Sequence, residues 1–105
     1  MSDADLRAAD LSGADMSGAD LENADLRGAN LQKTNVNKAR LFETVLGDVN
    51  LGTVLGLGYC IHLGPSIIDF RTLSQSGDLP LPFLRGCGLP DRLIEYLQSA
   101  RSGRT

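Results

Sequence analysis

Residues 4–31 read ADLRA ADLSG ADMSG ADLEN ADLRG ANL, a five-residue pattern that repeats without a gap. Each repeat begins with a small residue, a polar residue and a large apolar residue. This period fits no regular element, because five helical steps turn a side chain by about 140° and five strand steps carry it to the opposite face. The backbone must turn once per repeat if every large apolar side chain is to stay inside. We therefore expect the chain to wind into coils that stack on one another.

The tandem A-[DN]-L-x-x motif resembles the pentapeptide repeat family. Members of that family form a right-handed β-helix with four flat sides, in which four repeats make one coil. The resemblance implies a mainly β, quadrilateral solenoid whose side chains stack at intervals of twenty residues. The narrow interior needs small residues at the first position of each repeat, since large ones would overpack it. The expected core columns contain Leu6, Leu11, Met16, Leu21, Leu26, Leu31, Val36, Leu41, Leu46 and Leu51.

The repeat weakens toward the C-terminus, although its central apolar residue persists as far as Leu51. Ten repeats, with a doubtful further one at residues 54–56, give roughly two and a half coils, which is near the lower limit for a stable stack. The C-terminal half is expected to supply additional stability. We predict a β-helix over residues 3–55, a glycine-rich transition over 56–65, a helical cap over 66–100 and a frayed tail over 101–105.

The predicted cap consists of short helices. Ser66 is the expected N-cap of the first one, with Asp69 in its first turn, and Pro90 opens the last one. Such short helices are not stable alone, and an open coil end exposes core leucines and unpaired backbone groups. We expect the helices to cover that end with the apolar side chains of Ile67, Phe70, Leu73, Phe83, Leu84, Leu93, Ile94 and Leu97.

The C-terminal half carries a second resemblance. The segments HLGPSIID at 62–69, LPLPFLRGCGLP at 79–90 and IEYLQS at 94–99 resemble the region between pentapeptide repeats and a Toll/interleukin-receptor (TIR) domain in bacterial signalling proteins. This resemblance implies a setting in a bacterial defence or signalling protein. None of the NAD-cleaving residues of a TIR domain can be assigned to this chain.

The composition favours a single small domain with a thin core. The chain has 105 residues, a net charge of −3 and only 5% aromatic residues. The acidic N-terminus is followed by no apolar run, which argues against a secretory signal, and no stretch approaches the length of a membrane span. Cys60 and Cys87 lack C-x-x-C spacing. We expect a cytoplasmic protein with free thiols and no membrane association.

The sequence offers little for catalysis. His62 is the only histidine, so a nucleophilic site would have to combine it with Cys60 or Cys87 and with Asp69. Their spacing supports neither this arrangement nor a metal site, and Gly56-Leu57-Gly58 completes no phosphate-binding motif. Basic residues alternate with acids, which disfavours nucleic-acid binding. We expect no enzymatic activity, cofactor, metal or small-molecule substrate.

Two functions remain as hypotheses. The first is a non-catalytic scaffold that binds a protein partner or a second copy of itself. Its candidate self-association edge is the uncapped N-terminal coil, with Ala4, Leu6, Ala9, Leu11, Ala14 and Met16. The alternative follows from the family resemblance, since some members are acidic rods that mimic DNA and bind type II topoisomerases such as gyrase. The aspartates that suggest this reading are Asp5, Asp10, Asp15, Asp20 and Asp25.

Overall fold

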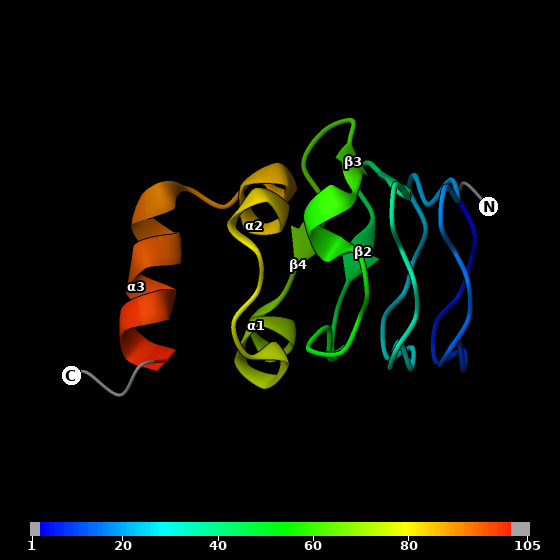
Figure 1. The fold of residues 1–105 in the computed structure, drawn as a ribbon, viewed down its shortest axis with the longest axis horizontal. Helices are drawn as coiled ribbons and strands as arrows, with labels where there is room; N and C mark the ends of the chain where they lie inside the picture. Colours follow the sequence, from blue (N-terminus) through cyan, green and yellow to red (C-terminus); the bar gives the residue numbers. More distant parts are fainter. Residues whose placement is uncertain (1–2, 102–105) are drawn as a thin grey trace.

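The structure is a computed structural model that describes residues 3–101. A stack of coils forms one end of the elongated molecule, which measures 40 × 24 × 19 Å, and three helices form the other (Figure 1). The helices are α1 (Phe70–Ser76), α2 (Leu81–Cys87) and α3 (Asp91–Arg101). Of the predicted frayed tail, Arg101 is the last residue of α3, and 102–105 lie outside the described residues.

Successive coils pair in parallel with the twenty-residue register that the repeat predicts. The Leu6 amide donates to the Asp25 carbonyl at 2.8 Å, and the Asp25 amide donates to the Ala4 carbonyl at 2.9 Å. This pairing builds a first coil over residues 3–22, a second over 23–42 and a third from residue 43 onward. The single bridges join Asp5 to Asp25, Asp10 to Asn30, Asp15 to Asn35, Asp20 to Arg40, Asp25 to Val45 and Asn35 to Leu55.

The polar second residue of each repeat shapes the turn that follows it. The Asp10 Oδ1 atom accepts the Ser12 amide at 3.1 Å, and the Asn30 Oδ1 atom accepts the Gln32 amide in the same way. These are Asx turns, which stabilise a tight bend locally. The last residue of the repeat then has a positive φ, as at Ala8 and Gly13. The Asp/Asn preference of the motif therefore has a conformational cause.

The interior columns hold the apolar residues that the repeat predicts. Leu6 and Leu11 are half-buried, because among residues 3–101 the first coil has a neighbouring coil on one side only. Where the first position carries threonine instead of alanine, its hydroxyl finds a partner inside, as in the 2.7 Å bond from Thr44 to the Leu21 carbonyl. The remaining predicted core residues are buried: Met16, Leu21, Leu26, Leu31, Val36, Leu41, Leu46 and Leu51.

The solenoid extends beyond residue 55, so the predicted glycine-rich transition over 56–65 and helix start at 66 are wrong. Strand β3 (Ile61–His62) pairs with β1 (Arg40–Leu41), and β4 (Ile67–Ile68) pairs with β2 (Val45–Leu46). These partners are offset by 21 and 22 residues instead of twenty, because the corners after Leu55 are longer. In the described part of the chain, the solenoid thus has three coils and one side of a fourth.

Leu57 shows how the third coil absorbs the first of these insertions. Leu55 stacks above Asn35, faces outward and is exposed. The buried residue of this side is Leu57, which lies in the short 3-10 helix Leu57–Tyr59. Strands in the described residues are only two residues long, so helical residues outnumber them. The expectation of a mainly β chain therefore fails by residue count, although the coils form the larger part of the molecule.

Helix α1 closes one side of the third coil with polar groups. Asp69 is its N-cap, not Ser66, and accepts the Thr72 amide at 2.9 Å. The Thr72 hydroxyl donates to the Leu46 carbonyl and accepts the Val49 amide, and the Ser76 hydroxyl accepts the Leu51 amide. These side chains replace the hydrogen bonds that a further coil would make.

Three side chains assigned to the apolar cap are exposed. Ile67 points outward because Ile68 takes the inward position of β4, and Phe70 is 75% exposed because α1 turns its polar face to the coil. Leu93 is exposed on α3, where Ile94 takes the buried position. The other assigned residues are buried or half-buried: Leu73, Phe83, Leu84, Ile94 and Leu97.

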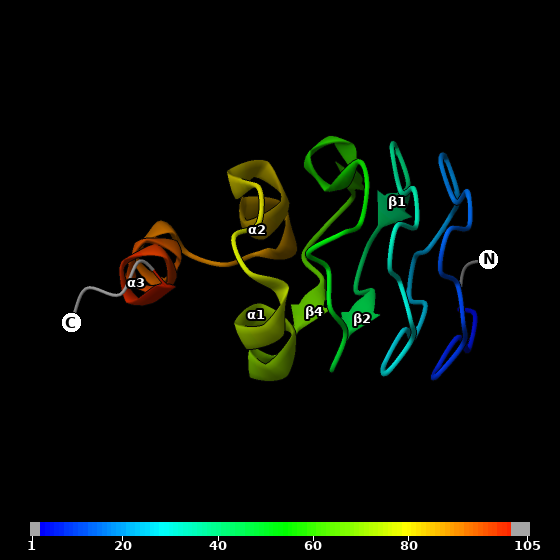
Figure 2. The ribbon, with the colours of Figure 1, turned by 60° about the horizontal axis from the view of Figure 1, so that its bottom comes forward.

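Helix α2 covers the sides of the third coil that α1 leaves open, and α3 packs on the outside of α2 (Figures 1 and 2). Phe83 is 1% exposed and lines the interior together with the leucine columns. The cap therefore has two chemically distinct parts. Helix α1 satisfies backbone groups and α2 covers apolar surface.

Replacing Thr72 with Val is expected to lower the free energy of unfolding by about 1–3 kcal/mol, because it leaves the buried Val49 amide without a partner and removes one of the two bonds to the Leu46 carbonyl while keeping the shape. Urea denaturation followed by circular dichroism measures the change. The exposed Ser74 on the same helix provides the control, and Ser74→Ala should stay within about 0.5 kcal/mol of the parent. Equal stabilities of the two variants would contradict the polar cap.

Candidate interaction surfaces

The N-terminal coil presents an open edge of backbone groups. In the second coil, the amides of Asp25, Asn30 and Asn35 donate to carbonyls of the first coil at 2.8–2.9 Å. Their equivalents at Asp5 and Asp10 have no acceptor within residues 3–101, and neither has the amide of Asp15. An unpaired edge of this kind is a template for pairing with another chain.

Side chains along this edge are only partly covered. Leu6 and Leu11 are half-buried, whereas their second-coil equivalents Leu26 and Leu31 are 3% and 4% exposed. Met16 is already buried within the first coil. The other residues assigned to the self-association edge are half-buried, namely Ala4, Ala9 and Ala14.

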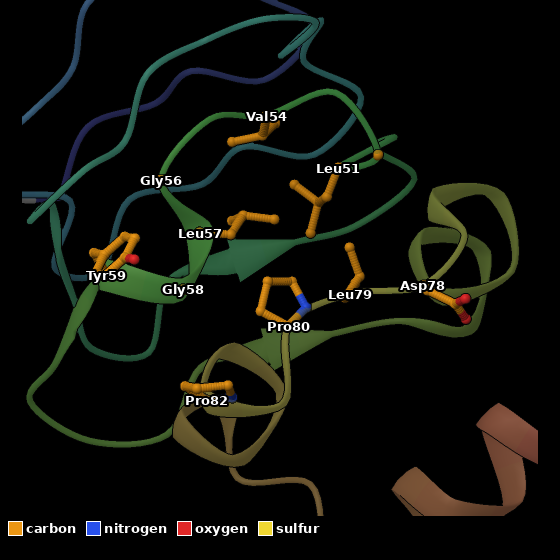
Figure 3. A pocket seen from close by; sticks show the side chains of 11 residues that line it. Leu51, Val54, Gly56, Leu57, Gly58, Tyr59, Asp78, Leu79, Pro80 and Pro82 are labelled. Carbon is orange, nitrogen blue, oxygen red and sulfur yellow. The ribbon is translucent and has the colours of Figure 1, made fainter.

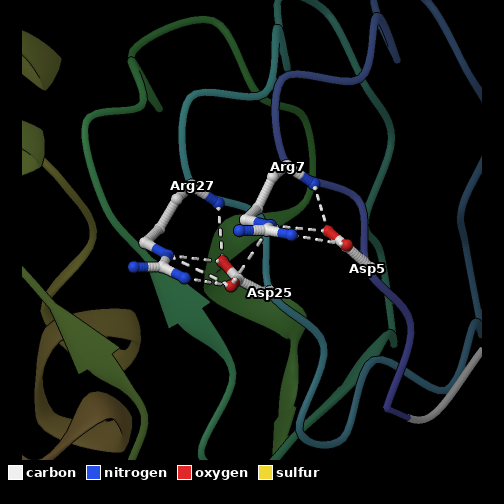
Figure 4. Close-up of polar contacts among 4 residues, drawn as sticks. All are labelled: Asp5, Arg7, Asp25 and Arg27. Atoms are coloured by element: carbon white, nitrogen blue, oxygen red, sulfur yellow. Dashed lines mark hydrogen bonds and ion pairs between the residues drawn. The ribbon is translucent and has the colours of Figure 1, made fainter.

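One face of the first two coils carries two stacked aspartate–arginine pairs (Figure 4). Arg7 Nη2 lies 2.9 Å from Asp5 Oδ2, and Arg27 Nη2 lies 2.7 Å from Asp25 Oδ2. The side-chain hydrogen bond from Arg7 holds the pKa of Asp5 at about 2, and Arg27 lowers the pKa of Asp25 in the same way. Each carboxylate has its own guanidinium, so the stacked aspartates do not form an uncompensated ladder.

The remaining first-coil aspartates are bonded within their own turns. The Ser12 hydroxyl donates to Asp10 at 2.7 Å and the Ser17 hydroxyl donates to Asp15 at the same distance, and these bonds lower the pKa of both carboxyls. The residues stacked above them are Asn30 and Asn35, which are neutral. At these two columns the negative charge is therefore confined to the first coil. The residue stacked above Asp20 is Arg40, whose Nη2 atom lies 3.4 Å from Asp20 Oδ2.

A cleft of about 550 Å³ lies between the third coil and the linker that joins α1 to α2 (Figure 3). Tyr59, which is exposed, lies at one end and Asp78 at the other, with Pro80 between them. Asp78 is the only ionisable side chain in the lining besides the Tyr59 phenol, so the cleft offers no acid–base pair or nucleophile–base pair. Its other lining residues are Leu51, Gly52, Val54, Gly56, Leu57, Gly58, Leu79 and Pro82.

The candidate catalytic residues are committed to structural contacts. Asp69 accepts the amides of Thr72 and Asp48, and the His62 ring packs on Phe83. Cys60 and Cys87 are free thiols, and burial raises their pKa values to about 11 and about 12, so both are protonated and weakly nucleophilic at neutral pH. A nucleophilic site in this chain would need one of these two thiols as its nucleophile.

Within residues 3–101, no three or more His, Cys, Asp and Glu side chains are grouped so that they could hold a metal ion. None of the helices described is both long enough and apolar enough to cross a bilayer.

Family comparison agrees with the geometry of the coils. Residues 4–41 match the model for pentapeptide repeats, in eight copies. This segment belongs to the pentapeptide repeat family. Pentapeptide repeats form β-helical solenoids that generally act as non-catalytic protein-interaction scaffolds. No curated protein and no solved structure matched the chain.

The pentapeptide match ends at Leu41, but the repeat geometry continues in the structure. Thr44 and Val49 occupy the first positions of two further repeats and are buried, as are the central residues Leu46 and Leu51. The polar cap was missed by the sequence reasoning. Its signal was the spacing of Asp69, Thr72 and Ser76, which places three polar side chains on one face of a helix.

Proposed function

We propose that this chain is a cytoplasmic, non-catalytic scaffold that self-associates through the open edge of its first coil. The observation that carries the proposal is the set of amides at Asp5, Asp10 and Asp15, which have no acceptor among the described residues and lie beside the half-buried Leu6 and Leu11. A second copy that stacks there supplies backbone partners and covers the leucines.

We further propose that the repeats wind as a right-handed, four-sided β-helix. Four positive-φ corners within each twenty-residue coil support four sides, for example Asn23, Gly28, Lys33 and Lys38 in the second coil. The bridges at intervals of twenty residues support one coil per four repeats.

Charge affects how two copies meet at this edge. A two-fold axis would bring the aspartate-bearing first coils of two copies together. Within residues 3–101, Asp10 and Asp15 have no arginine partner, so their repulsion opposes the contact at low ionic strength. Association should therefore strengthen between about 20 and 500 mM salt, where the charges are screened and apolar contacts persist.

Size-exclusion chromatography with light scattering tests the proposal. We expect the mass to rise from 11.2 kDa toward twice that value as protein and salt concentrations increase. Leu11→Lys should remain monomeric because it places a charge in the contact. Its matched control, Ser12→Lys, carries the same charge on the adjacent exposed residue and should still associate.

Circular dichroism establishes that each variant is folded. If Leu11→Lys does not fold, Leu6→Lys places the charge at the other half-buried leucine of the same edge. A parent chain that stays monomeric at all concentrations contradicts the proposal, as does association of the lysine edge variants equal to that of the parent.

A finer proposal concerns the biological setting. The likeness of segments 62–69, 79–90 and 94–99 to the region that precedes TIR domains supports a role as the assembly module of a bacterial defence or signalling protein. Fusing a TIR domain after α3 tests this role. The fusion should show NAD cleavage that depends on protein concentration, and Leu11→Lys should abolish that dependence.

The alternative candidate is a DNA mimic that binds gyrase. The ionised aspartates of the first coil favour it, as their lowered pKa values keep them charged. The neutral Asn30 and Asn35 and the paired arginines stand against it, because they limit the acidic surface. A supercoiling assay distinguishes the two functions. The scaffold predicts no inhibition at micromolar protein, and inhibition would favour the mimic.

A further inference from the structure

His62 occupies an interior position that leucine holds in the earlier coils. It pairs with Leu41 in the parallel register of β1 and β3, and Leu41 lies one coil above Leu21. The imidazole packs on the ring of Phe83 from α2, with ring centroids 5.7 Å apart and planes inclined at 59°. The backbone at Gly86 of the same helix lies against the imidazole so closely that a Cβ atom there would collide with it.

Both ring nitrogens of His62 are buried without a hydrogen-bond partner. Among the described residues, the only other buried side-chain polar atom without one is the hydroxyl of Ser66. The Ser66 amide donates to the Cys87 carbonyl at the end of α2, so these three unsatisfied atoms lie where segment 62–66 meets that helix. Burying unsatisfied polar atoms opposes docking, and burying a charged imidazolium there would oppose it far more strongly.

We propose that His62 is an acid-sensitive latch for the cap: protonation of its imidazole releases α2 from the third coil and uncovers Phe83 and the ends of the leucine columns. This inference goes beyond the proposed scaffold function. It concerns the end of the solenoid opposite the self-association edge, and neither depends on the other.

Among the described residues, no carboxylate forms a hydrogen bond or ion pair with this ring. The carboxylates of Asp20 and Asp91 are paired with other groups. Arg40 Nη2 lies 3.4 Å from Asp20 Oδ2, and Arg85 Nε lies 2.9 Å from Asp91 Oδ1. Burial is the cause that lowers the pKa of His62. The charged or titratable groups on the elements packed around it are Arg40 of β1, Glu43 of the adjoining corner, Cys60 before β3, and Arg85 and Cys87 of α2.

The direction of the pH effect follows from the lowered pKa. The open state, in which His62 is in water, binds a proton at a pH of about 6.5, and the closed state binds it only at lower pH. The stabilisation of the closed cap by neutral His62 is therefore complete above pH 6.5 and is lost as the pH falls below that value. The equilibrium constant for docking of α2 on the third coil should fall by up to about tenfold per pH unit until the lowered pKa of His62 is reached.

The aspartates of the coils respond in a different range. Their pKa values are lowered from 3.8, to about 2 at Asp5, so their ionised forms stabilise the folded chain. That contribution is lost only as the pH falls below 3.8. Measurements between pH 5 and pH 8 therefore report on His62 without a contribution from these carboxylates.

Hydrogen exchange of the full chain at pH 5, 6, 7 and 8, corrected for the intrinsic exchange rate, tests the latch. We expect the protection of amides in α2, such as that of Leu84, to fall by up to about tenfold per pH unit below 6.5. Amides of the second coil, such as that of Asn30, should keep their protection. Unchanged protection of α2 between pH 7 and pH 5 would overturn the proposal.

His62→Leu restores the leucine column and removes the titrating group. Its α2 protection should be independent of pH over the same range. If this variant does not fold, His62→Gln removes the titration while keeping a polar side chain, and it should be equally insensitive to pH. Persistence of the parent's pH dependence in the folded variant would also overturn the latch.

Discussion

Replacing Leu26 with Asp is expected to unfold the coils. Leu26 is 3% exposed, with Leu6 and Leu46 in the coils on either side of it. An unpaired carboxylate at this place has no cation or hydrogen-bond donor, and burying such a group costs about 3–5 kcal/mol or more. A domain of this size has a total stability of about 5–10 kcal/mol, so most of it would be lost. Thermal melts followed by circular dichroism would show a broad, early transition or none.

The control introduces the same carboxylate where the coil is exposed. Gln32 is exposed at a corner, and Gln32→Asp should change the stability by less than about 0.5 kcal/mol. Arg27→Asp is a poorer control, because it removes the ion pair with Asp25 and puts two carboxylates together. Comparable melting temperatures for Leu26→Asp and Gln32→Asp would mean that the interior columns are assigned wrongly.

The repeat made the coil register predictable. Because the five-residue period is constant, each position of the repeat faces the same way, inward or outward, in every repeat. The same backbone hydrogen bonds between coils then recur along the chain. The bridges from Asp5 to Asp25 and from Asp15 to Asn35 confirm this twenty-residue register. The role of the N-terminal edge in self-association stays a prediction, because pairing with a second copy depends on an intermolecular contact.

The end of the solenoid was harder to predict, because insertions at the corners hide the period. One extra residue before β3 and another before β4 shift the inward residues to Leu57, His62 and Ile68. The backbone bonds between coils survive, since a corner can lengthen without displacing the sides that it connects. A pattern of fixed spacing cannot detect such a continuation.

The composition of the cap misled the prediction for a different reason. Apolar residues in a short amphipathic helix usually face the core. Here the coil side beneath α1 presents unpaired amides, so Thr72 and Ser76 face inward and Phe70 faces outward. The partner surface, not the helix sequence alone, decides which face is buried.

Phe83→Ala is expected to remove most of the contribution of α2 to the stability of the chain. The ring is 1% exposed, lines the interior with the leucine columns and packs on His62. Truncating a buried phenylalanine costs about 3–5 kcal/mol, because the transfer free energy is lost and a cavity remains. Urea denaturation should give this decrease, and hydrogen exchange should show it first in α2 and in segment 61–68 of the third and fourth coils.

Phe70→Ala is the matched control, since it makes the same change on the neighbouring helix α1, where the ring is 75% exposed. It should alter the free energy of unfolding by less than about 0.5 kcal/mol. The contrast separates a cap that depends on apolar closure by α2 from one that depends only on the backbone partners supplied by α1. If Phe83→Ala were as stable as Phe70→Ala, the hydroxyls of Thr72 and Ser76 would suffice to terminate the solenoid, and α2 would be a peripheral addition.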